Sequence, residues 1–516
     1  MLKEIYKTVI LMALLKGVIL ALFASEVTLV QMIADDSFYY WLIAKNLILN
    51  GLSSFDGGQT STSGYHLLWA LLLSPVTIFE GSKGAEMKAF ALFTSVFAIF
   101  GFVIAFAKIF KKRDREFLGV CAVLVTSYSW ITNSTGGMEW SIVVLLQAVV
   151  FSLFLVKRQV NFGWLLTIGI LGSMARTDFG LAIFILFLVK FIFQKHKMSA
   201  AVDELHNVSF LLLGSIIGIL FTFIIFELVA GNWLQDSAVV KSMWADAHGS
   251  KPLSTIFQFL RGVLYIGDLT VHDISRIIKY DDYILLVTGT LFCAMLFIIG
   301  YGGDKKIQKI LKILPESVAA SFLIIVAYGL LYSIKVVEVQ PWYTGNITIP
   351  LFIVFHWLVR LARIFLANKN VSVFPIHVLL IFLICTNMFG FLKQPFPHPA
   401  QVHMKQIGEY YAQKYTNEVV GFSGAGVVSF YQGGKTLNLD GLVNGQLLDY
   451  MPNNLPCFLK DYNVSVFDGF GASGKFFGVE SPLAYSTIET TIYTDEFETT
   501  LYRLNSFKLA CYDTDG

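Results

Sequence analysis

The chain has 516 residues, of which 55% are hydrophobic and only 14% are charged. Soluble domains carry about 25% charged residues, and a soluble fold of this size could not hide so much apolar surface from water. The composition therefore excludes a soluble enzyme, a disordered protein and a fibrous protein. The net charge of +2, from 38 basic and 36 acidic residues, gives no reason to expect a nucleic-acid partner.

Apolar runs separated by clusters of Lys and Arg predict a polytopic α-helical membrane protein with about eleven spans. Crossing the hydrocarbon core takes about 17 to 25 residues, and several of the runs lie near the lower limit. The runs are residues 8–28, 88–108, 116–132, 140–156, 161–175, 179–194, 208–230, 282–301, 317–334, 346–365 and 374–392.

One further apolar run, 65–80, is short and contains Pro75. If this run does not cross, basic clusters such as 111–115 and 305–312 all fall on one side, as the positive-inside rule requires. We therefore interpret it as an interfacial or re-entrant helix in an inner or plasma membrane protein, with the N-terminus cytoplasmic and the C-terminus outside. The long outer loops are then 33–87 and 231–281, and 253–269 could lie along the membrane surface.

The C-terminal segment has a different composition from the rest of the chain. After the proline-containing stretch 393–403, short β-like runs, over 418–422, 464–467, 487–493 and 499–504, alternate with Gly-rich turns. We expect an outer soluble domain of α/β or α+β type over residues 395–516, following a membrane domain over residues 1–394. Cys457 and Cys511 both lie in this soluble segment and could form a disulfide.

Asp35 and Asp36 come directly after the first span. The segment that follows has apolar residues at Phe38, Leu42 and Ile48, which predicts a helix lying on the membrane surface with both carboxylates at the water–lipid boundary. One of two adjacent acids can raise the pKa of the other, which suits a general base. Two solvated loop acids are the alternative interpretation.

The stretches DDSFYYWLIAKN (35–46) and TSTSGYHLLWALL (60–72) resemble the first outer loop of GT-C glycosyltransferases. These multi-span enzymes take sugars from polyprenyl-phosphate carriers and include bacterial arabinofuranosyl- and mannosyltransferases. Their motif has a basic residue about nine positions after the acid. Because Lys45 has this spacing from Asp36, the resemblance favours Asp36 over Asp35 as the base. His66 stands where several members carry a basic residue or a histidine.

Later stretches resemble further motifs of the same family, in the same order and all in expected outer loops. Lys241 is retained in its motif, although Gln235-Asp236 replaces an expected proline there. The stretches are NSTGGMEW (133–140, with Glu139), GSMARTDF (172–179, with Arg176 and Asp178), GNWLQDSAVVKSMW (231–244), QPWYTGN (340–346, with Trp342 and Tyr343) and GGKTLNLDGLVN (433–444).

The resemblance implies an inverting transfer of one sugar from a polyprenyl-phosphate donor to a glycan, lipid or protein acceptor on the outer face. No cofactor is required, although clustered acids could hold a divalent cation, the candidates being Asp35, Asp36 and Asp178. The donor phosphate would be bound by Arg176, which can form a fork onto phosphate oxygens, by Lys241 and by His66. Lys45, Glu139, Asp178, Trp342 and Tyr343 complete the expected substrate-binding set.

Two other functions stay open on the sequence. A transporter or lipid flippase needs ionisable residues deep in its spans, and only Lys16 and Glu227 qualify. An inert scaffold would leave Asp36, Glu139 and Arg176 more than about 15 Å apart, beyond contact with one donor. Several candidate site residues also have ordinary structural explanations. Lys241 could be a solvated loop lysine, Arg176 and Asp178 could form an ion pair at a span end, and Trp342 and Tyr343 could belong to the interfacial belt of aromatic residues.

Overall fold

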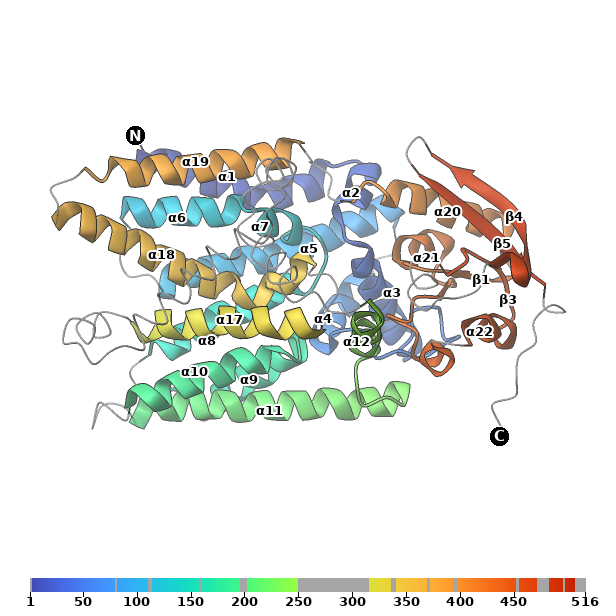
Figure 1. Cartoon of the computed structure of the whole chain (residues 1–516), viewed down its shortest axis with the longest axis horizontal. Coiled ribbons are helices and arrows are strands. Elements are labelled where there is room, and N and C mark those ends of the chain that lie inside the picture. Colours follow the sequence, from blue (N-terminus) through green and yellow to red (C-terminus); the bar gives the residue numbers. More distant parts are fainter. Residues whose placement is uncertain are drawn as a thin grey trace.

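A computed structural model gives the architecture of the protein. Figure 1 shows a bundle of long helices, a smaller part that contains the β-sheet, and a layer of short helices between them. The structure describes residues 2–78, 81–109, 114–156, 159–194, 202–248, 315–335, 340–368, 372–393, 398–451, 454–470, 482–494 and 497–505.

Ten of the eleven expected spans correspond to helices of the bundle, and the remaining run, 282–301, lies outside the described residues, as does 253–269. Among the described residues, four helical stretches are long and apolar enough to cross a membrane: Leu2–Phe23, Lys83–Ile109, Asp203–Ala230 and Trp342–Ala367. The bundle helices are α1 (Leu2–Phe23), α5 (Lys83–Ile104, continued by a π-helical turn at Ala105–Ile109), α6 (Arg115–Thr126), α8 (Trp140–Phe154), α9 (Phe162–Ala175), α10 (Phe179–Gln194), α11 (Val202–Ala230), α17 (Glu316–Lys335), α18 (Gly345–Asn368) and α19 (Phe374–Lys393).

The bundle has the packing expected of helices in lipid. Large apolar side chains are exposed on its outside, and on α11 Leu220 and Phe221 are 55% and 45% exposed. Such a surface is stable only where lipid replaces water. Inside, glycine lets α9 and α11 approach closely, since a Cβ atom on Gly214 would lie 2.3 Å from the carbonyl oxygen of Leu166.

The expected span over 116–132 is wrong in its second half. Helix α6 ends at Thr126, and a separate short helix, α7 (Tyr128–Asn133), follows. Between them Ser127 is extended, and its hydroxyl oxygen accepts a hydrogen bond from the backbone N–H of Trp130 at 3.3 Å. This serine caps a new helix, and therefore interrupts an apolar run whose hydrophobicity alone predicts one continuous span.

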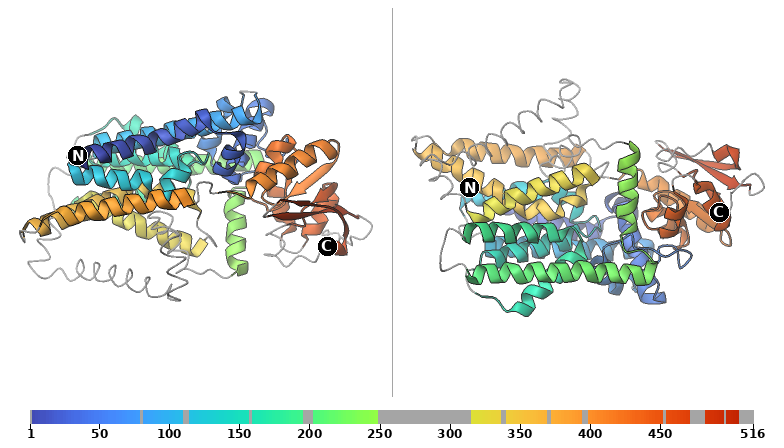
Figure 2. Two further views of the ribbon diagram at one scale, coloured as in Figure 1. Left: turned by 90° about the horizontal axis from the view of Figure 1, so that it is seen from above. Right: turned by 60° about the horizontal axis from the view of Figure 1, so that its bottom comes forward.

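Four helices form the layer between the bundle and the sheet: α2 (Glu26–Met32), α3 (Asp35–Asn50), α4 (Leu67–Thr77) and α12 (Asp236–His248). Helix α12 runs across the long axis of the bundle (Figure 2). The 11 residues of α4 extend about 17 Å, too short to cross a hydrocarbon core of about 30 Å, in agreement with the interpretation of 65–80. Helix α3 does not lie open on a surface as expected, because its residues Ser37–Ala44 are buried.

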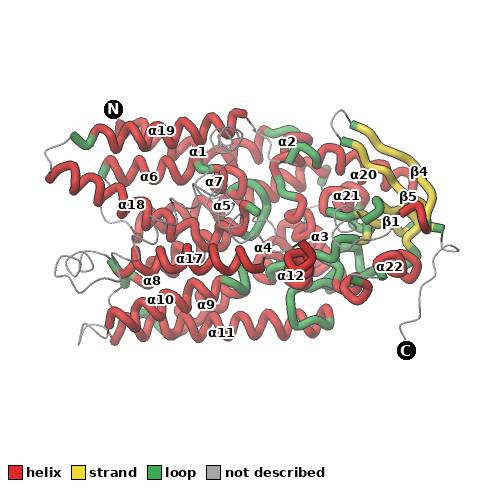
Figure 3. The backbone as a smooth tube through the Cα atoms, viewed as in Figure 1, coloured by secondary structure: helices red, strands yellow, loops and turns green. Residues whose placement is uncertain are grey.

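The C-terminal part contains a mixed five-stranded sheet, shown in yellow in Figure 3, which confirms the expected fold class of a helical membrane protein with a C-terminal domain of α/β or α+β type. The strand order is β2-β1-β3-β5-β4, with β2, β1 and β3 parallel and the last two pairings antiparallel. Leu437, Phe458 and Phe467 belong to its buried core. The elements are α20 (Gln401–Lys414), β1 (Val419–Phe422), α21 (Gly426–Gln432), β2 (Leu437–Asn438), α22 (Leu455–Asp461), β3 (Val464–Phe467), β4 (Ser486–Tyr493) and β5 (Glu498–Leu504).

Candidate active site

The first turn of α3 holds the two adjacent acids. Ala34 precedes this helix in an extended conformation, and its backbone N–H donates to the carbonyl oxygen of Gly136 at 3.1 Å. The Ser37 hydroxyl donates to the same carbonyl oxygen. These bonds fix the start of α3 against the loop that carries Met138 and Glu139, and the positive end of the helix dipole favours acidic residues there.

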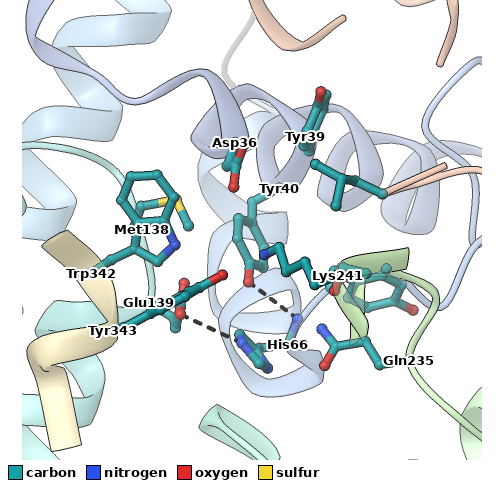
Figure 4. A pocket seen from close by; sticks show the side chains of 14 residues that line it. Asp36, Tyr39, Tyr40, His66, Met138, Glu139, Gln235, Lys241, Trp342 and Tyr343 are labelled. Atoms are coloured by element: carbon teal, nitrogen blue, oxygen red, sulfur yellow. Dashed lines mark hydrogen bonds and ion pairs between the residues drawn. The ribbon is translucent and has the colours of Figure 1, made fainter. Parts of the chain in front are cut away.

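Asp36 faces a small recess at this junction (Figure 4), with a cavity volume of about 40 Å³. Its carboxylate makes no hydrogen bond to any of the residues that the structure describes. Burial raises the pKa of Asp36 to about 6, with Lys241 opposing the rise and Asp440 and Glu139 adding to it. The recess is lined by Asp36, Tyr39, Tyr40, Gly64, Tyr65, His66, Met138, Glu139, Gln235, Ser237, Lys241, Trp342, Tyr343 and Leu442.

Arg176 is clamped between two carboxylates. Its Nη1 lies 2.6 Å from Oε1 of Glu139, and its Nε and Nη2 each lie 3.0 Å from an oxygen of Asp178. Asp178 also accepts hydrogen bonds from the Tyr332 hydroxyl at 2.6 Å and from Nδ2 of Asn346 at 2.8 Å. Burial alone would raise the pKa of Asp178, but the Arg176 guanidinium and the hydrogen-bond donors hold it below its ordinary value.

Glu139 connects this clamp to the recess. The side chain is 1% exposed, and its Oε1 atom lies 3.5 Å from Nε2 of His66 as well as beside Arg176. Its second oxygen, Oε2, is buried and has no hydrogen-bond partner among the described residues. Because an unpaired buried carboxylate oxygen is costly, this atom is a strong acceptor for a hydroxyl group that enters the recess.

His66, one of the expected phosphate-binding residues, lines both the recess and the adjoining cavity, but its burial disfavours the charged imidazolium. Burial lowers the pKa of His66 to about 4, although the neighbouring Glu139 carboxylate opposes this shift. The imidazole is therefore neutral near pH 7 and can act there only as a hydrogen-bonding group. Sequence alone does not report this burial, which comes from residues distant in the chain.

Lys241 is the second cation of the site and comes from α12. Burial opposes its charged form, but Tyr343 and the Asp36 carboxylate raise the pKa of Lys241 above its ordinary value. The Lys241 ammonium lies 5.2 Å from the centre of the Tyr343 ring, and the Arg176 guanidinium carbon lies 5.3 Å from it. Lys241 and Arg176, the two expected cations, therefore both lie close to the Tyr343 ring.

A larger cavity of about 520 Å³ adjoins the recess and shares His66, Lys241 and Tyr343 with it. Arg176 and Asp178 line this cavity on one side. Its wall also contains apolar and small side chains: Leu234, Ala238, Val239, Met243 and Leu331. The structure therefore places a polar recess beside a cavity that has both cations and an apolar wall.

Two expected site residues line neither cavity. The Asp35 carboxylate accepts hydrogen bonds from the backbone N–H groups of Gly426 and Val427, at 3.3 and 2.7 Å. Burial raises the pKa of Asp35 to about 8 in spite of these donors. Lys45 is half-buried further along α3, and nine residues of helix place it about 14 Å along the axis from Asp36.

Sequence reasoning missed Asp236, which fixes α12 to the first outer loop. This fully buried carboxylate accepts hydrogen bonds from the Thr62 hydroxyl at 3.0 Å and the Ser63 N–H at 2.8 Å. In return, the Asp236 N–H donates to the Ser63 hydroxyl at 3.0 Å. The signal that could have found it was the departure from the motif at this point, where Gln235-Asp236 replaces the expected proline. Tyr40, Tyr65 and Leu442 were also missed as lining residues, since aromatic and apolar side chains are common throughout the chain.

The described residues include no group of three or more His, Cys, Asp or Glu side chains arranged to hold a metal ion. Of the three acids considered for a divalent cation, Asp35 is bonded to backbone amides and Asp178 to Arg176, Tyr332 and Asn346. Asp36, Glu139 and Arg176 do converge, since Asp36 and Glu139 line one recess and Glu139 contacts Arg176. This convergence contradicts the separation that an inert scaffold would show.

No protein-family model and no curated protein sequence matches this chain. Its structure is similar to that of ArnT from Cupriavidus metallidurans bound to undecaprenyl phosphate, with a TM-score of 0.53, 9% identity and coverage of 98% of both chains. ArnT in the apo state gives 0.48 at 10% identity, over 94% of this chain and 97% of that one. The archaeal oligosaccharyltransferase AglB from Archaeoglobus fulgidus, in complex with an inhibitory peptide and a dolichol-phosphate, gives 0.40 at 10% identity, over 98% and 75%. The chain therefore has the fold of ArnT along almost its whole length.

Proposed function

We propose that the protein is an integral-membrane inverting glycosyltransferase. It moves one sugar from a polyprenyl-phosphate carrier to an acceptor hydroxyl on a glycan, lipid or protein at the outer face. The observation that carries this proposal is the Asp36 carboxylate, which faces the recess without a hydrogen bond to the described residues and lies near the cation Lys241. Attack on a phosphate-linked sugar requires both a base, which takes the proton of the acceptor hydroxyl, and a cation, which stabilises the leaving phosphate.

Asp36 acts as the general base in this proposal. The acceptor hydroxyl must lose its proton as its oxygen attacks the anomeric carbon, and a base with a pKa near the working pH is the most effective. A pKa of about 6 keeps most of the Asp36 carboxylate ionised at pH 7 while leaving it more basic than a solvated aspartate. Attack opposite the phosphate inverts the anomeric configuration.

Lys241 and Arg176 stabilise the leaving phosphate. Both line the larger cavity, whose apolar wall suits the first isoprene units of the carrier. Arg176 is held in place by Glu139 and Asp178, so its guanidinium is already oriented at the wall of the cavity before a phosphate binds. Support for a carrier of this class comes from ArnT, which was crystallised with undecaprenyl phosphate.

Glu139, Trp342 and Tyr343 would contact the sugar from the recess, whose volume of about 40 Å³ is too small for a whole sugar, so most of the sugar would lie in the adjoining cavity of about 520 Å³. The unpaired Oε2 atom of Glu139 would accept a hydrogen bond from a sugar hydroxyl, because this removes the cost of leaving it unpaired. The aromatic rings of Trp342 and Tyr343 line the same recess and offer faces for stacking. His66, neutral near pH 7, would donate or accept a hydrogen bond rather than supply charge.

We infer that the membrane domain extends over residues 1–394 and that the soluble domain over 395–516 lies outside the cell membrane, with the N-terminus in the cytoplasm. Cys457 on α22 is disulfide-bonded, while Cys121 and Cys385 are free. Disulfides persist in oxidising compartments, so this bond supports an outer location for α22. The partner of Cys457 lies outside the described residues.

The test is transfer of radiolabelled sugar from a panel of polyprenyl-phosphate sugars to membrane extracts by the full-length protein. Asp36→Asn removes the base and should lower transfer by about 10²- to 10⁴-fold, the usual contribution of a general base. Asp449→Asn is the matched control, because Asp449 is exposed and lies outside both cavities. Full activity of Asp36→Asn would exclude Asp36 as the base, and absence of transfer from every donor by the parent would contradict the proposed function.

A further inference from the structure

The C-terminal sheet part contacts the candidate active site directly, through the segments that follow its parallel strands β1 and β2. The first turn of α21, which follows β1, donates two backbone N–H groups to Asp35. The loop after β2 contacts the first outer loop so closely that a Cβ atom on Gly64 would lie 1.8 Å from the carbonyl oxygen of Leu442. Two further bonds join these segments, from the Gly445 N–H and the Gln446 amide to Ser61.

Asp440 is the acid at the centre of this contact. Its side chain is 5% exposed and follows β2 in the NLDGLVN stretch. Oδ1 accepts a hydrogen bond from the Leu442 N–H at 2.8 Å, and Oδ2 accepts from the Gly424 N–H at 2.8 Å. Oδ2 also accepts from the Tyr39 hydroxyl at 3.3 Å, which crosses from the sheet to α3.

Two of the residues that donate hydrogen bonds to Asp440 line the recess. Tyr39 and Leu442 both line it together with Asp36, and Tyr39 lies one helical turn along α3 from that acid. The Tyr39 hydroxyl is held from a second direction by Nδ2 of Asn438 at 3.3 Å. Asp440 therefore joins the sheet to the helix that carries the base, and it fixes one side of the recess.

We propose that the C-terminal sheet completes the active site and that Asp440 is a positioning residue, which holds Tyr39 and Leu442 around Asp36. This inference rests on the proposed transferase function. It assigns a role to the sheet beyond that of a domain appended outside the membrane. It also divides the two adjacent acids: Asp36 faces the substrate, and Asp35 binds the start of α21.

The negative charge of Asp440 affects the pKa of Asp36. A purely structural role of Asp440 would leave that pKa unchanged, so the pKa of Asp36 distinguishes the two roles. The charged groups that act on Asp36 are Lys241 from α12, Glu139 from the start of α8, and Asp440 from the segment after β2, and the first two also line the recess. After burial, which has the largest effect, Lys241 lowers the pKa of Asp36 while Asp440 and Glu139 raise it. Removing the charge of Asp440 should therefore lower the pKa of the base.

The experiment compares Asp440→Asn and Tyr39→Phe with the parent in full-length protein, using the polyprenyl-phosphate sugar that the parent accepts. Both variants should lower kcat by about 10-fold or more, since small misplacements at a catalytic centre are costly. The acidic limb of kcat/KM should move to lower pH by about half a unit in Asp440→Asn, which loses the charge. The limb should stay in place in Tyr39→Phe, which keeps the charge, and Asp449→Asn should match the parent in both measurements.

Amide hydrogen exchange on the same proteins tests the contact without any donor. Faster exchange at 35–42 and 59–66 in Asp440→Asn than in Asp449→Asn is expected, because the loop after β2 loses its anchor to α3. An unchanged kcat and pH limb in a folded Asp440→Asn protein would overturn the inference while leaving the transferase proposal intact. Unchanged exchange in both segments would overturn it even if no donor were found.

Discussion

The ion-pair clamp around Arg176 gives the sharpest test of how the site is held. Arg176 is 5% exposed and is the cation shared by Glu139, which is 1% exposed, and Asp178. Replacing it by Ala leaves the buried carboxylate of Glu139 and the partly exposed carboxylate of Asp178 without this counter-charge. Breaking a buried ion pair in this way costs about 3–5 kcal/mol. Lys keeps the charge but cannot reach both carboxylates with one ammonium, so Arg176→Lys should show an intermediate loss of stability.

The stability loss is measured by thermal unfolding of the purified proteins in detergent, followed by tryptophan emission. Arg176→Ala should have the lowest unfolding temperature of the single variants. Combining it with Glu139→Gln and Asp178→Asn should restore much of the lost stability, because the two unpaired carboxylate charges are then removed. The single variants Glu139→Gln and Asp178→Asn complete the cycle. If Arg176→Ala unfolds like the parent and loses only activity, the clamp is not structural and the reasoning is refuted.

Two further predictions concern the pH dependence and the contact with the sheet. Because Asp36 must be ionised to act as a base, kcat/KM should fall as the pH drops through about 6, and a profile that is flat from about pH 5 to 7 would contradict this assignment. Gly64→Ala should disrupt docking of the sheet and lower transfer by about 10-fold or more, because its Cβ atom would lie 1.8 Å from the Leu442 carbonyl oxygen. Gly84→Ala is the control, because its Cβ atom would meet its nearest neighbour at 3.4 Å; equal activity of the two variants would rule out the docking argument.

Much of the architecture follows from local pattern. Long apolar runs predict helices in lipid for two reasons. Backbone N–H and C=O groups without hydrogen bonds are costly in lipid, and a helix pairs them internally; polar side chains are costly there as well. The expected strands over 464–467 and 487–493 coincide with β3 and nearly with β4, since alternation and flanking turn residues are also local signals. The interruption at Ser127 was missed because one capping hydrogen bond decides it within an apolar run.

The sequence by itself determined the class of protein, the order of its apolar helices, and the presence of two adjacent acids, Asp35 and Asp36, after the first apolar helix. Only the tertiary structure decided that Asp36 faces the recess whereas Asp35 binds Gly426 and Val427. It also decided that His66 is neutral near pH 7 and that Asp440, 404 positions after Asp36, adds charge beside it. The physical reason is that hydrophobicity acts through neighbours in the chain, whereas burial, charge and hydrogen bonding at a site depend on residues brought together by the fold.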